Sequence, residues 1–431
     1  MNKLLYLLLF FICSLLFSSC NNKVSNTKTA QSVQTTDSIT LVKLNRAKVC
    51  AVNVTSTSTT PVKFYISPAR YNFQNYQTLL ADIIKGESTD KEKAIAIWKF
   101  TENWTYHSQS AMRERLPHDP LRLFNSFESG LCDDRNAALT NMFLLAGLQA
   151  RAYHLEGHVV AEVFYENAWH MYDADWNLYF KDDKGDAASV EYLSNHPEAI
   201  CKERSSGGEG WLKFSLGMMI LKHDYTTKQN NHIGTWYTDM PLNYTNKIQL
   251  AKGDVLNFNY SVTDNIDKVQ LLIAQHAVIN NKRTGMLSRQ VADWNAKRIN
   301  SNEWVMAENL PYAVKIIHIT AKAKADIKSD IKIYYSPDGN KWYYKGVITP
   351  GFSSVRFNVF DAENQPVAFN YFIKFSGANV NVDFDKRALI VENSFLFSDK
   401  LFLNADNAFK LVYLQPQHGG YLNINCTAED E

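Results

Sequence analysis

The sequence predicts an α+β protein, with helices and strands mixed in the first part and strands alone in the second. Between residues 61 and 237, helical periodicity and strand alternation follow one another along the chain. From residue 238 to residue 431, the apolar runs are short and turn residues separate them. We therefore expect a mixed domain at 61–237, followed by a β-rich accessory region at 238–431 made of one or two β-sandwiches.

Length and charge set the outer limits of the prediction. At 431 residues with 45% hydrophobic content, the chain can bury substantial cores and form two or three domains. Its 45 Lys and Arg nearly balance its 44 Asp and Glu. Because no overall charge of either sign results, the composition does not indicate nucleic acid as a partner.

The first nineteen residues have the pattern of a signal peptide. Lys3 supplies a positive start, residues 4–17 are apolar but too short for a membrane span, and small residues precede Cys20. The run Phe17-Ser-Ser-Cys20 resembles the lipobox of bacterial lipoproteins, although Phe17 stands where Leu is usual. The resemblance implies cleavage before Cys20 and lipidation of that cysteine. The alternative is a plain secretory signal with a structural Cys20.

The segment after this leader is polar. Residues 21–40 lack a continuous apolar run, so we expect a flexible tether at 20–60 between membrane and folded domain. No later segment is long and apolar enough to span a bilayer. Together with the lipobox, this predicts a protein held in the bacterial cell envelope by a lipid anchor, in the periplasm or at the outer membrane.

Three helices are expected before the first strand of the mixed domain. Thr89 and Asp90 are capping residues, and the apolar positions after them recur at helical spacing. A short helix is expected at 121–127, after Pro117 and Pro120. The third follows Cys132, and Gly147 is its expected end. Its apolar stripe consists of Leu139, Met142, Phe143 and Ala146.

Cys132 therefore lies at the N-terminus of a buried helix. The helix dipole and the free N–H groups there favour a thiolate and can bind a developing oxyanion. Asp133 and Asp134 work against the thiolate, and the sequence does not decide between the two effects. The chain that follows Cys20 contains three further cysteines besides Cys132, namely Cys50, Cys201 and Cys426. Four scattered cysteines form no disulfide framework, and if one pair is bridged we expect Cys132 to stay free.

Strand parity selects a histidine. Strands are expected at 150–155, 158–165 and 168–176, with a turn at Glu166-Asn167. A loop of two or four residues there places His158 opposite Asp175, and Val160 opposite Asp173. Both aspartates then share the face of His158, whereas His170 points to the other face. This favours His158 as the base but does not choose between the two aspartates.

The combined pattern resembles the transglutaminase-like superfamily. It comprises Gly-Leu-Cys132 opening a helix, the run Ala-Gly-Leu-Gln-Ala-Arg151, His158 with Glu162, and Trp169 with Asp173. The resemblance covers roughly residues 75–180 and implies a papain-like core, in which N-terminal helices pack on an antiparallel sheet. It implies that Cys132 is the nucleophile, His158 the base and Asp173 the orienter, with Glu162 and Trp169 as supports. The chain departs from the family at Val-Val after His158, and at Asp173-Ala-Asp175 where many members have Asp-Pro-Thr.

These residues predict a cysteine enzyme that acts on amide bonds of a peptide or protein. His158 would take the proton of Cys132, and a thioester would form on the sulfur, with hydrolysis expected over crosslinking. No cofactor and no metal are expected, because a site of Cys132, His158 and Asp173 would have three mixed ligands and no second cluster. The alternative is a non-catalytic surface lipoprotein that keeps the fold to bind glycan or protein.

The β-rich region offers a second, weaker functional signal. Strands are expected at 254–262, 331–335, 357–360 and 369–375, and Ser336-Pro-Asp-Gly-Asn340 is a strong hairpin turn. The stretch from Tyr335 to Trp342 loosely resembles discoidin-type carbohydrate-binding sandwiches. Its aromatic side chains either contact carbohydrate or pack as in an ordinary hairpin. Residues 205–210 are expected to form a flexible loop, and 182–186 a turn rather than a calcium loop.

Overall fold

The structure is a computed structural model. It describes residues 29–35, 39–44, 49–108, 115–201, 205–207, 210–222, 235–239, 241–260, 283–292, 294–321, 329–350, 353–359, 367–377, 389–402, 404, 406, 408–414 and 422–428. The leader predicted at 1–19 and the predicted lipidation residue Cys20 lie outside these ranges. Within them, no helix combines the length and the apolar character needed to cross a membrane.

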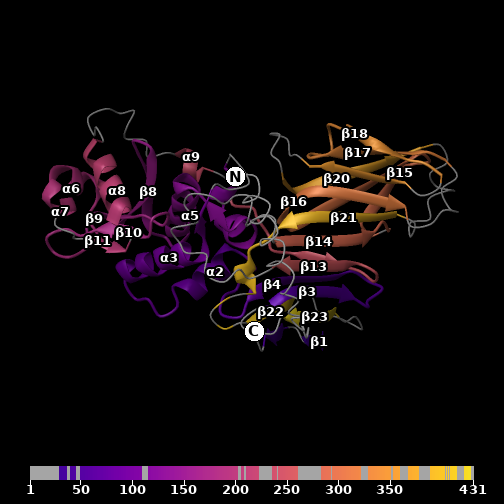
Figure 1. Ribbon diagram of the computed structural model, residues 1–431, viewed down its shortest axis with the longest axis horizontal. Coiled ribbons are helices and arrows are strands. Elements are labelled where there is room, and N and C mark those ends of the chain that lie inside the picture. Colours follow the sequence, from indigo (N-terminus) through magenta and orange to yellow (C-terminus); the bar gives the residue numbers. More distant parts are fainter. Residues whose placement is uncertain are drawn as a thin grey trace, which may run out of the picture.

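The fold is α+β, as expected. Figure 1 shows the helices gathered at one end of the molecule and a large twisted sheet at the other. The main helices of the first end are α2 (Tyr76–Ile83), α3 (Asp90–Trp104), α5 (Cys132–Leu145), α6 (Val190–Asn195), α7 (Pro197–Cys201), α8 (Gly210–Lys222) and α9 (Thr235–Thr238).

Local sequence explains where α3 begins and what it buries. The Thr89 side chain accepts the N–H of Glu92, and the Glu92 carboxylate accepts the N–H of Thr89, a reciprocal cap at the first turn. Ala94, Ile97 and Trp98 then face the core. The short helix expected at 121–127 is present as two joined turns, α4 (Pro120–Arg122) and η2 (Leu123–Phe127), which follow the turn η1 (Leu116–His118).

Helix α5 and a three-stranded antiparallel sheet form the centre of the helical end. The sheet is β7 (Gln149–Leu155), β8 (His158–Tyr165) and β9 (Ala168–Tyr172), in that order. Leu139, Met142 and Phe143 of the predicted stripe are fully buried. Gly147 follows α5 with a φ of +79°, a left-handed conformation that glycine adopts without strain.

The second hairpin has the predicted register as far as Tyr172, but its last strand is shorter than the predicted 168–176, so the predicted pairs of His158 with Asp175 and of Val160 with Asp173 do not form. Glu166 and Asn167 have positive φ, which gives a two-residue turn of the kind that joins twisted strands. Tyr165 pairs with Ala168, and Ala161 pairs with Tyr172. The regular ladder stops at Tyr172, and the chain then turns so that Asp173 bridges Leu178 of β10 (Leu178–Phe180). Asp173 thus leaves the strand at the edge that holds His158.

The other end is built from two antiparallel sheets. The larger has the order β1-β23-β3-β13-β14-β21-β16-β20-β17-β18, with β15 and β19 on β16, and the smaller has the order β12-β4-β22-β2. The larger sheet contains β1 (Thr29–Thr35), β3 (Val49–Ser56), β13 (Val255–Tyr260), β14 (Arg283–Gln290), β15 (Ala296–Asn300), β16 (Glu303–Ala321), β17 (Ile331–Ser336), β18 (Tyr343–Ile348), β19 (Ser354–Asn358), β20 (Ala368–Ser376), β21 (Leu389–Leu396) and β23 (Leu422–Ala428). The smaller contains β2 (Ile39–Lys43), β4 (Val62–Pro68), β12 (Ile248–Leu250) and β22 (Ala408–Tyr413).

The flexible tether predicted at 20–60 is wrong over its described residues. β1 pairs with β23, β2 pairs with β22, and β3 lies between β23 and β13. Val52 and Val54 of β3 are fully buried. The polar composition of this segment suggested a tether because its strand partners lie hundreds of residues later, where local pattern cannot reveal them.

The boundary predicted at residue 61 is crossed by the smaller sheet. β4 lies inside the predicted 61–237 domain but pairs with β12 on one side and β22 on the other. The loop expected at 205–210 is also partly ordered, since β11 (Ser205–Gly207) pairs with β10. The turn expected at 182–186 is present, because the Gly185 N–H donates to the Asp182 carbonyl.

Buried hydrogen bonds join the two ends. The Ser126 hydroxyl donates to the Leu396 carbonyl at 2.9 Å and accepts the Ala313 N–H at 2.8 Å. The neighbouring Asn125 amide donates to the Pro311 carbonyl at 3.1 Å. Because η2 carries these contacts and leads into the chain before Cys132, the β-rich end supports the approach to α5.

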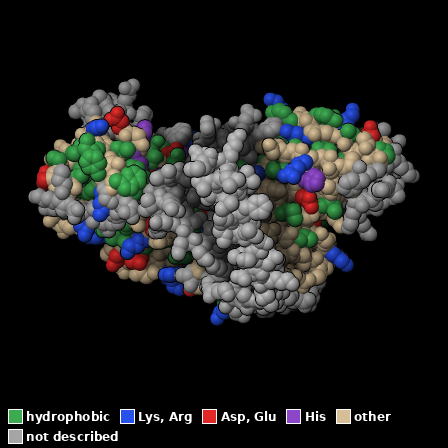
Figure 2. Space-filling view, in the orientation of Figure 1, with side chains coloured by type: hydrophobic (Ala, Val, Ile, Leu, Met, Phe, Trp, Pro, Cys, Tyr) green, Lys and Arg blue, Asp and Glu red, His purple; other side chains and the backbone are tan. Residues whose placement is uncertain are grey.

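The surface visible in Figure 2 has no large area covered by side chains of one charge. Figure 2 shows Lys and Arg interspersed with Asp and Glu, and a group of hydrophobic side chains at the helical end. Trp211 and Phe214 of α8 are exposed to 53% and 69%. The mixed charge agrees with the near-zero net charge of the sequence.

Candidate active site

Cys132 is the first residue of α5, as the sequence predicted. The chain approaches it through β6 (Ser129–Gly130), which pairs in parallel with β5 (Tyr106–His107). A Cβ atom on Gly130 would lie 2.5 Å from the Asp134 Cβ, so only glycine allows this close approach. At the first position of a helix the N–H of Cys132 has no partner within the helix, and it is available to an incoming oxyanion.

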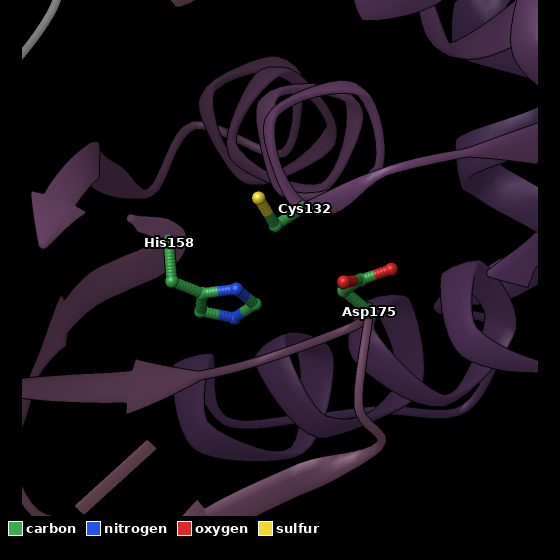
Figure 3. A group of neighbouring side chains, drawn as sticks. All are labelled: Cys132, His158 and Asp175. Carbon is green, nitrogen blue, oxygen red and sulfur yellow. The ribbon is translucent and has the colours of Figure 1, made fainter. Parts of the chain in front are cut away.

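His158 and Asp173 meet as the resemblance implied. The His158 Nε2 lies 2.8 Å from the Asp173 Oδ2, and both side chains are buried. This contact uses Nε2, so Nδ1 is the nitrogen left for the thiol. The Cys132 sulfur and a His158 nitrogen lie within 4.8 Å of each other, and Figure 3 shows the imidazole ring turned toward the Cys132 sulfur. The order Cys132, His158, Asp173 is therefore a connected chain of contacts.

Asp173 is held by a residue of α5, the helix that begins at Cys132. The Asn136 side-chain amide donates to the Asp173 Oδ1 at 2.9 Å and to the Val159 carbonyl at 2.8 Å, while its oxygen accepts the Ala174 N–H. The Asp175 N–H also donates to the Asp173 Oδ1, at 2.8 Å. These donors fix one carboxylate oxygen and leave the other directed at His158.

The surroundings of His158 favour the uptake of a proton by its ring. Burial alone would lower the pKa of this imidazole, but the charge and hydrogen bond of Asp173, together with the contact to Cys132, raise it well above its usual value. Trp176 covers one side of the ring, with 4.1 Å between ring centroids and near-parallel planes. An imidazolium formed when His158 takes up a proton is thus paired with the Asp173 carboxylate and stacked on the Trp176 indole.

The two aspartates that parity left open have different partners. The Asp175 Oδ1 lies 2.7 Å from the His107 Nδ1 and accepts from the Arg135 guanidinium at 3.2 Å. Burial would raise the pKa of the Asp175 carboxyl, but the hydrogen bond and charge of His107 and the charge of Arg135 hold it below its usual value. Asp173 therefore orients His158, while Asp175 ends a second, separate contact chain in the same site.

The residues assigned to support have structural contacts. Glu162 is fully buried, pairs with Arg151 at 2.6 Å and accepts the Val190 N–H at 2.8 Å. The Arg151 guanidinium lies 4.0 Å above the Trp169 ring. These contacts tie β8 to β7, β9 and α6.

The other histidines lie away from the thiol. The His170 ring stacks on Tyr165 with centroids 3.6 Å apart, on the face opposite His158, as parity predicted. His118 is buried near Asp134, and burial followed by the charge of Arg115 lowers its pKa to about 3. His154 is exposed. His107 differs from these three, because Asp175 connects it to the site.

The described cysteines are free thiols. Cys132 is partly exposed and Cys426 is buried, and burial raises the pKa of Cys426 to about 11. The side chains of Cys50 and Cys201 lie outside the description. The prediction that Cys132 is unbridged is confirmed.

Among the residues that the structure describes, two groups of side chains have the spacing of metal ligands. The sulfur of Cys132, a nitrogen of His158 and a carboxylate oxygen of Asp175 lie within 4.8 Å of one another, and a second group is His118, Asp133 and Asp134. The first group uses Asp175 in place of the Asp173 considered from sequence. A metal there would occupy the thiol and the ring nitrogen that acid–base chemistry needs.

Sequence reasoning missed several residues that shape this site. Asn136 and Arg135 are polar residues in the first turns of α5, where their composition suggests an exposed face, yet both are buried. Tyr237 of α9 packs beside Cys132 from about one hundred residues later. Helical spacing from Cys132 indicates Asn136 one turn on, so a face-by-face reading of α5 would have found it. No local signal indicates Tyr237.

Comparisons with known proteins do not identify a family. No family model and no curated protein matches the chain. Among solved structures, a similar chain is the secreted serine protease VesC from Vibrio cholerae, with 9% sequence identity and a TM-score of 0.15. The match covers 33% of each chain, so this protein spans about a third of the length of VesC. A likeness this slight carries no argument, and the candidate site rests on its own geometry.

Proposed function

We propose that this chain is a cysteine enzyme of the papain-like, transglutaminase-like type that acts on amide bonds of a peptide or protein. The observation that carries the proposal is the contact chain from Cys132 to His158 to Asp173, with 2.8 Å between the His158 Nε2 and the Asp173 Oδ2. Its placement supports the proposal further, because the thiol opens a buried helix and is partly exposed.

Acylation follows from this arrangement. The Cys132 thiol transfers its proton to the His158 Nδ1, and Asp173 stabilises the imidazolium through Nε2. The thiolate attacks the amide carbonyl carbon, and the Cys132 N–H donates to the oxyanion. The imidazolium then protonates the leaving nitrogen, the C–N bond breaks, and a thioester remains on Cys132.

The acceptor decides the outcome of the second half-reaction. Water attacks the thioester with His158 as base, and a carboxylic acid and the free thiol result. An amine in place of water gives a new amide bond. Hydrolysis is the outcome we expect, since water is the more abundant acceptor.

The test incubates the purified mature protein with libraries of peptides, peptidoglycan fragments and amine donors, followed by mass spectrometry. We expect hydrolysed products that depend on Cys132 and disappear in Cys132→Ala. Cys426→Ala is the matched control, because it removes a buried thiol of β23, outside the candidate site. Products equal in the wild type and in Cys132→Ala would contradict the proposal.

The alternative function is capture of glycan or protein without catalysis. Tyr344 of β18 is 57% exposed, in the hairpin that suggested carbohydrate contact. Retained affinity for carbohydrate, with a Cys132 that no acylating or alkylating reagent reaches, would favour this alternative. Loss of that affinity in Tyr344→Ala would place the contact in the β-rich region.

The lipoprotein-like leader belongs to the same proposal. Lipidation of Cys20 would hold the enzyme at the cell envelope, facing peptide or protein substrates there. Metabolic labelling with an alkyne fatty acid should mark the wild type and not Cys20→Ser. Equal labelling of both, or labelling of neither, would reject the anchor without affecting the cysteine chemistry.

A further inference from the structure

The Asp175 carboxylate has one oxygen that no contact within the site uses. Its Oδ1 is paired with His107 and Arg135. Its Oδ2 is buried and has no hydrogen-bond partner among the residues that the structure describes. A buried carboxylate oxygen without a partner costs free energy. The site therefore offers an acceptor that a bound substrate can satisfy.

This carboxylate faces the reacting groups. An oxygen of Asp175, the Cys132 sulfur and a His158 nitrogen lie within 4.8 Å of one another. Figure 3 shows Asp175 and His158 on two sides of the space next to the Cys132 sulfur. An atom bonded to a carbon under attack by this sulfur is within reach of Asp175.

Charge and hydrogen bonding decide which substrate atom that is. The carbonyl oxygen becomes negative during attack, and a carboxylate beside it would oppose the reaction. An aliphatic acyl group would leave the carboxylate without a hydrogen bond. The leaving nitrogen carries an N–H and gains positive charge when His158 protonates it, so it alone matches an anionic acceptor.

We infer that Asp175 is a specificity-determining residue, whose Oδ2 accepts the N–H of the leaving nitrogen and so selects carboxamides that carry at least one N–H. The inference rests on the proposed function of Cys132 and narrows its substrate class. Primary carboxamides and ordinary peptide bonds are accepted. Tertiary amides, such as the bond before proline, are rejected, because they would leave the buried carboxylate unpaired.

The same contact operates when an amine attacks the thioester. A primary amine forms a C–N bond to the thioester carbon, gives one proton to His158 and keeps one N–H, which donates to Asp175. The C–S bond then breaks, and the thiol regains the proton from His158. A secondary amine gives its one proton to His158 and has none left for Asp175.

The experiment uses this difference and needs no natural substrate. p-Nitrophenyl acetate acetylates Cys132, with release of nitrophenolate as an initial burst. Glycinamide or its N-methyl analogue sarcosinamide then competes for the acetyl group, in the presence of a chelator. The measured quantity is the ratio of acetylated glycinamide to acetylated sarcosinamide. We expect this ratio to be at least about tenfold higher with the enzyme than with a small acetyl thioester in solution, which gives the solution ratio.

Asp175→Asn is the decisive variant. It keeps the shape of the side chain and an oxygen for His107 and Arg135, but puts an N–H₂ donor where Oδ2 was. We expect its glycinamide preference to fall to the solution ratio. Both amines compete for the same acetyl-enzyme, so a change in the burst rate does not alter this preference. Asp133→Asn removes a charge beside Cys132 without touching the acceptor, and it should keep the preference.

The outcomes separate the two proposals. A burst that is absent from the wild type, or unchanged in Cys132→Ala, rejects the proposed function. The role of Asp175 alone is overturned if the burst depends on Cys132 but the wild type shows only the solution ratio. It is also overturned if Asp175→Asn keeps the preference of the wild type. If Asp175→Asn gives no burst, Asp175→Ser is the second variant, and a wild-type ratio equal to the solution ratio still overturns the inference.

Discussion

The amide of Asn136 lies 2.9 Å from the Oδ1 of Asp173, so the helix that begins at Cys132 also holds the carboxylate that pairs with His158. One turn of α5 separates Cys132 from Asn136. The distance from thiol to imidazole is therefore fixed through a rigid element and does not depend on a loop.

Asn136→Ala should impair both stability and reactivity. It removes the side-chain donor to the Val159 carbonyl and to the Asp173 Oδ1, and the acceptor of the Ala174 N–H, which costs roughly 2–4 kcal/mol of unfolding free energy. We expect alkylation of Cys132 to slow by about tenfold. Asn141→Ala is the matched control, since Asn141 is a buried amide of the same helix that binds the His118 and Tyr237 carbonyls. Equal slowing in both variants would reject the specific role of Asn136.

Cys132 should be the most reactive thiol of the chain. Near neutral pH we expect iodoacetamide to label it at least about tenfold faster than Cys426, which is buried with a pKa of about 11. His158→Ala should slow the labelling of Cys132 alone. Mass spectrometry of the peptides containing Cys50, Cys132, Cys201 and Cys426 measures each rate. Equal, slow labelling of all four would argue strongly against a nucleophile.

The His158–Asp173 pair should make stability depend on pH. The folded pKa of His158 is raised above the ordinary 6.5, so its contribution is complete below that value and is lost as pH rises through the folded pKa. Asp173→Asn removes the charge that raises it. The difference in Tm between the wild type and Asp173→Asn should therefore narrow as pH rises above about 6.5. The Asp175 carboxyl stays ionised throughout this pH range, because the pKa of Asp175 is lowered. A difference in Tm that widens as pH rises would contradict a raised pKa of His158 in the folded protein.

A fragment of residues 61–237 should not fold alone. It would lack both neighbours of β4, and it would leave Asn125 and Ser126 without Pro311, Ala313 and Leu396. We expect insoluble expression or loss of a cooperative thermal transition, whereas a chain covering residues 29–428 should show one. A soluble, cooperatively folded 61–237 fragment would restore the predicted boundary.

The sequence predicted the local features of the site well, because each has a short-range cause. Alternation over eight residues and one turn placed His158 and Asp173 on one face, and helix periodicity placed Cys132 at a helix start. The same parity argument could not separate Asp173 from Asp175. The structure separates them through His107 and Arg135, which the local pattern did not connect to Asp175.

Long-range pairing was the part that the sequence did not predict. The strand T-A-Q-S-V-Q-T at 29–35 has little apolar alternation, and its partner is β23 near the end of the described chain. β4 was assigned to the wrong region for the same reason, because β12 and β22 come from distant segments. Local pattern can predict a strand, but its neighbours depend on the tertiary fold.

The pairing of β3 with both β13 and β23 has a consequence for how the chain folds. Val52 lies opposite Phe258 on one side and opposite Cys426 on the other. β3 therefore pairs with strands that lie about two hundred and about four hundred residues later in the chain. Such non-local closure is slow, and the larger sheet cannot be completed while its last strand is still being synthesised. The larger sheet therefore stays incomplete until the last residues of the chain are available.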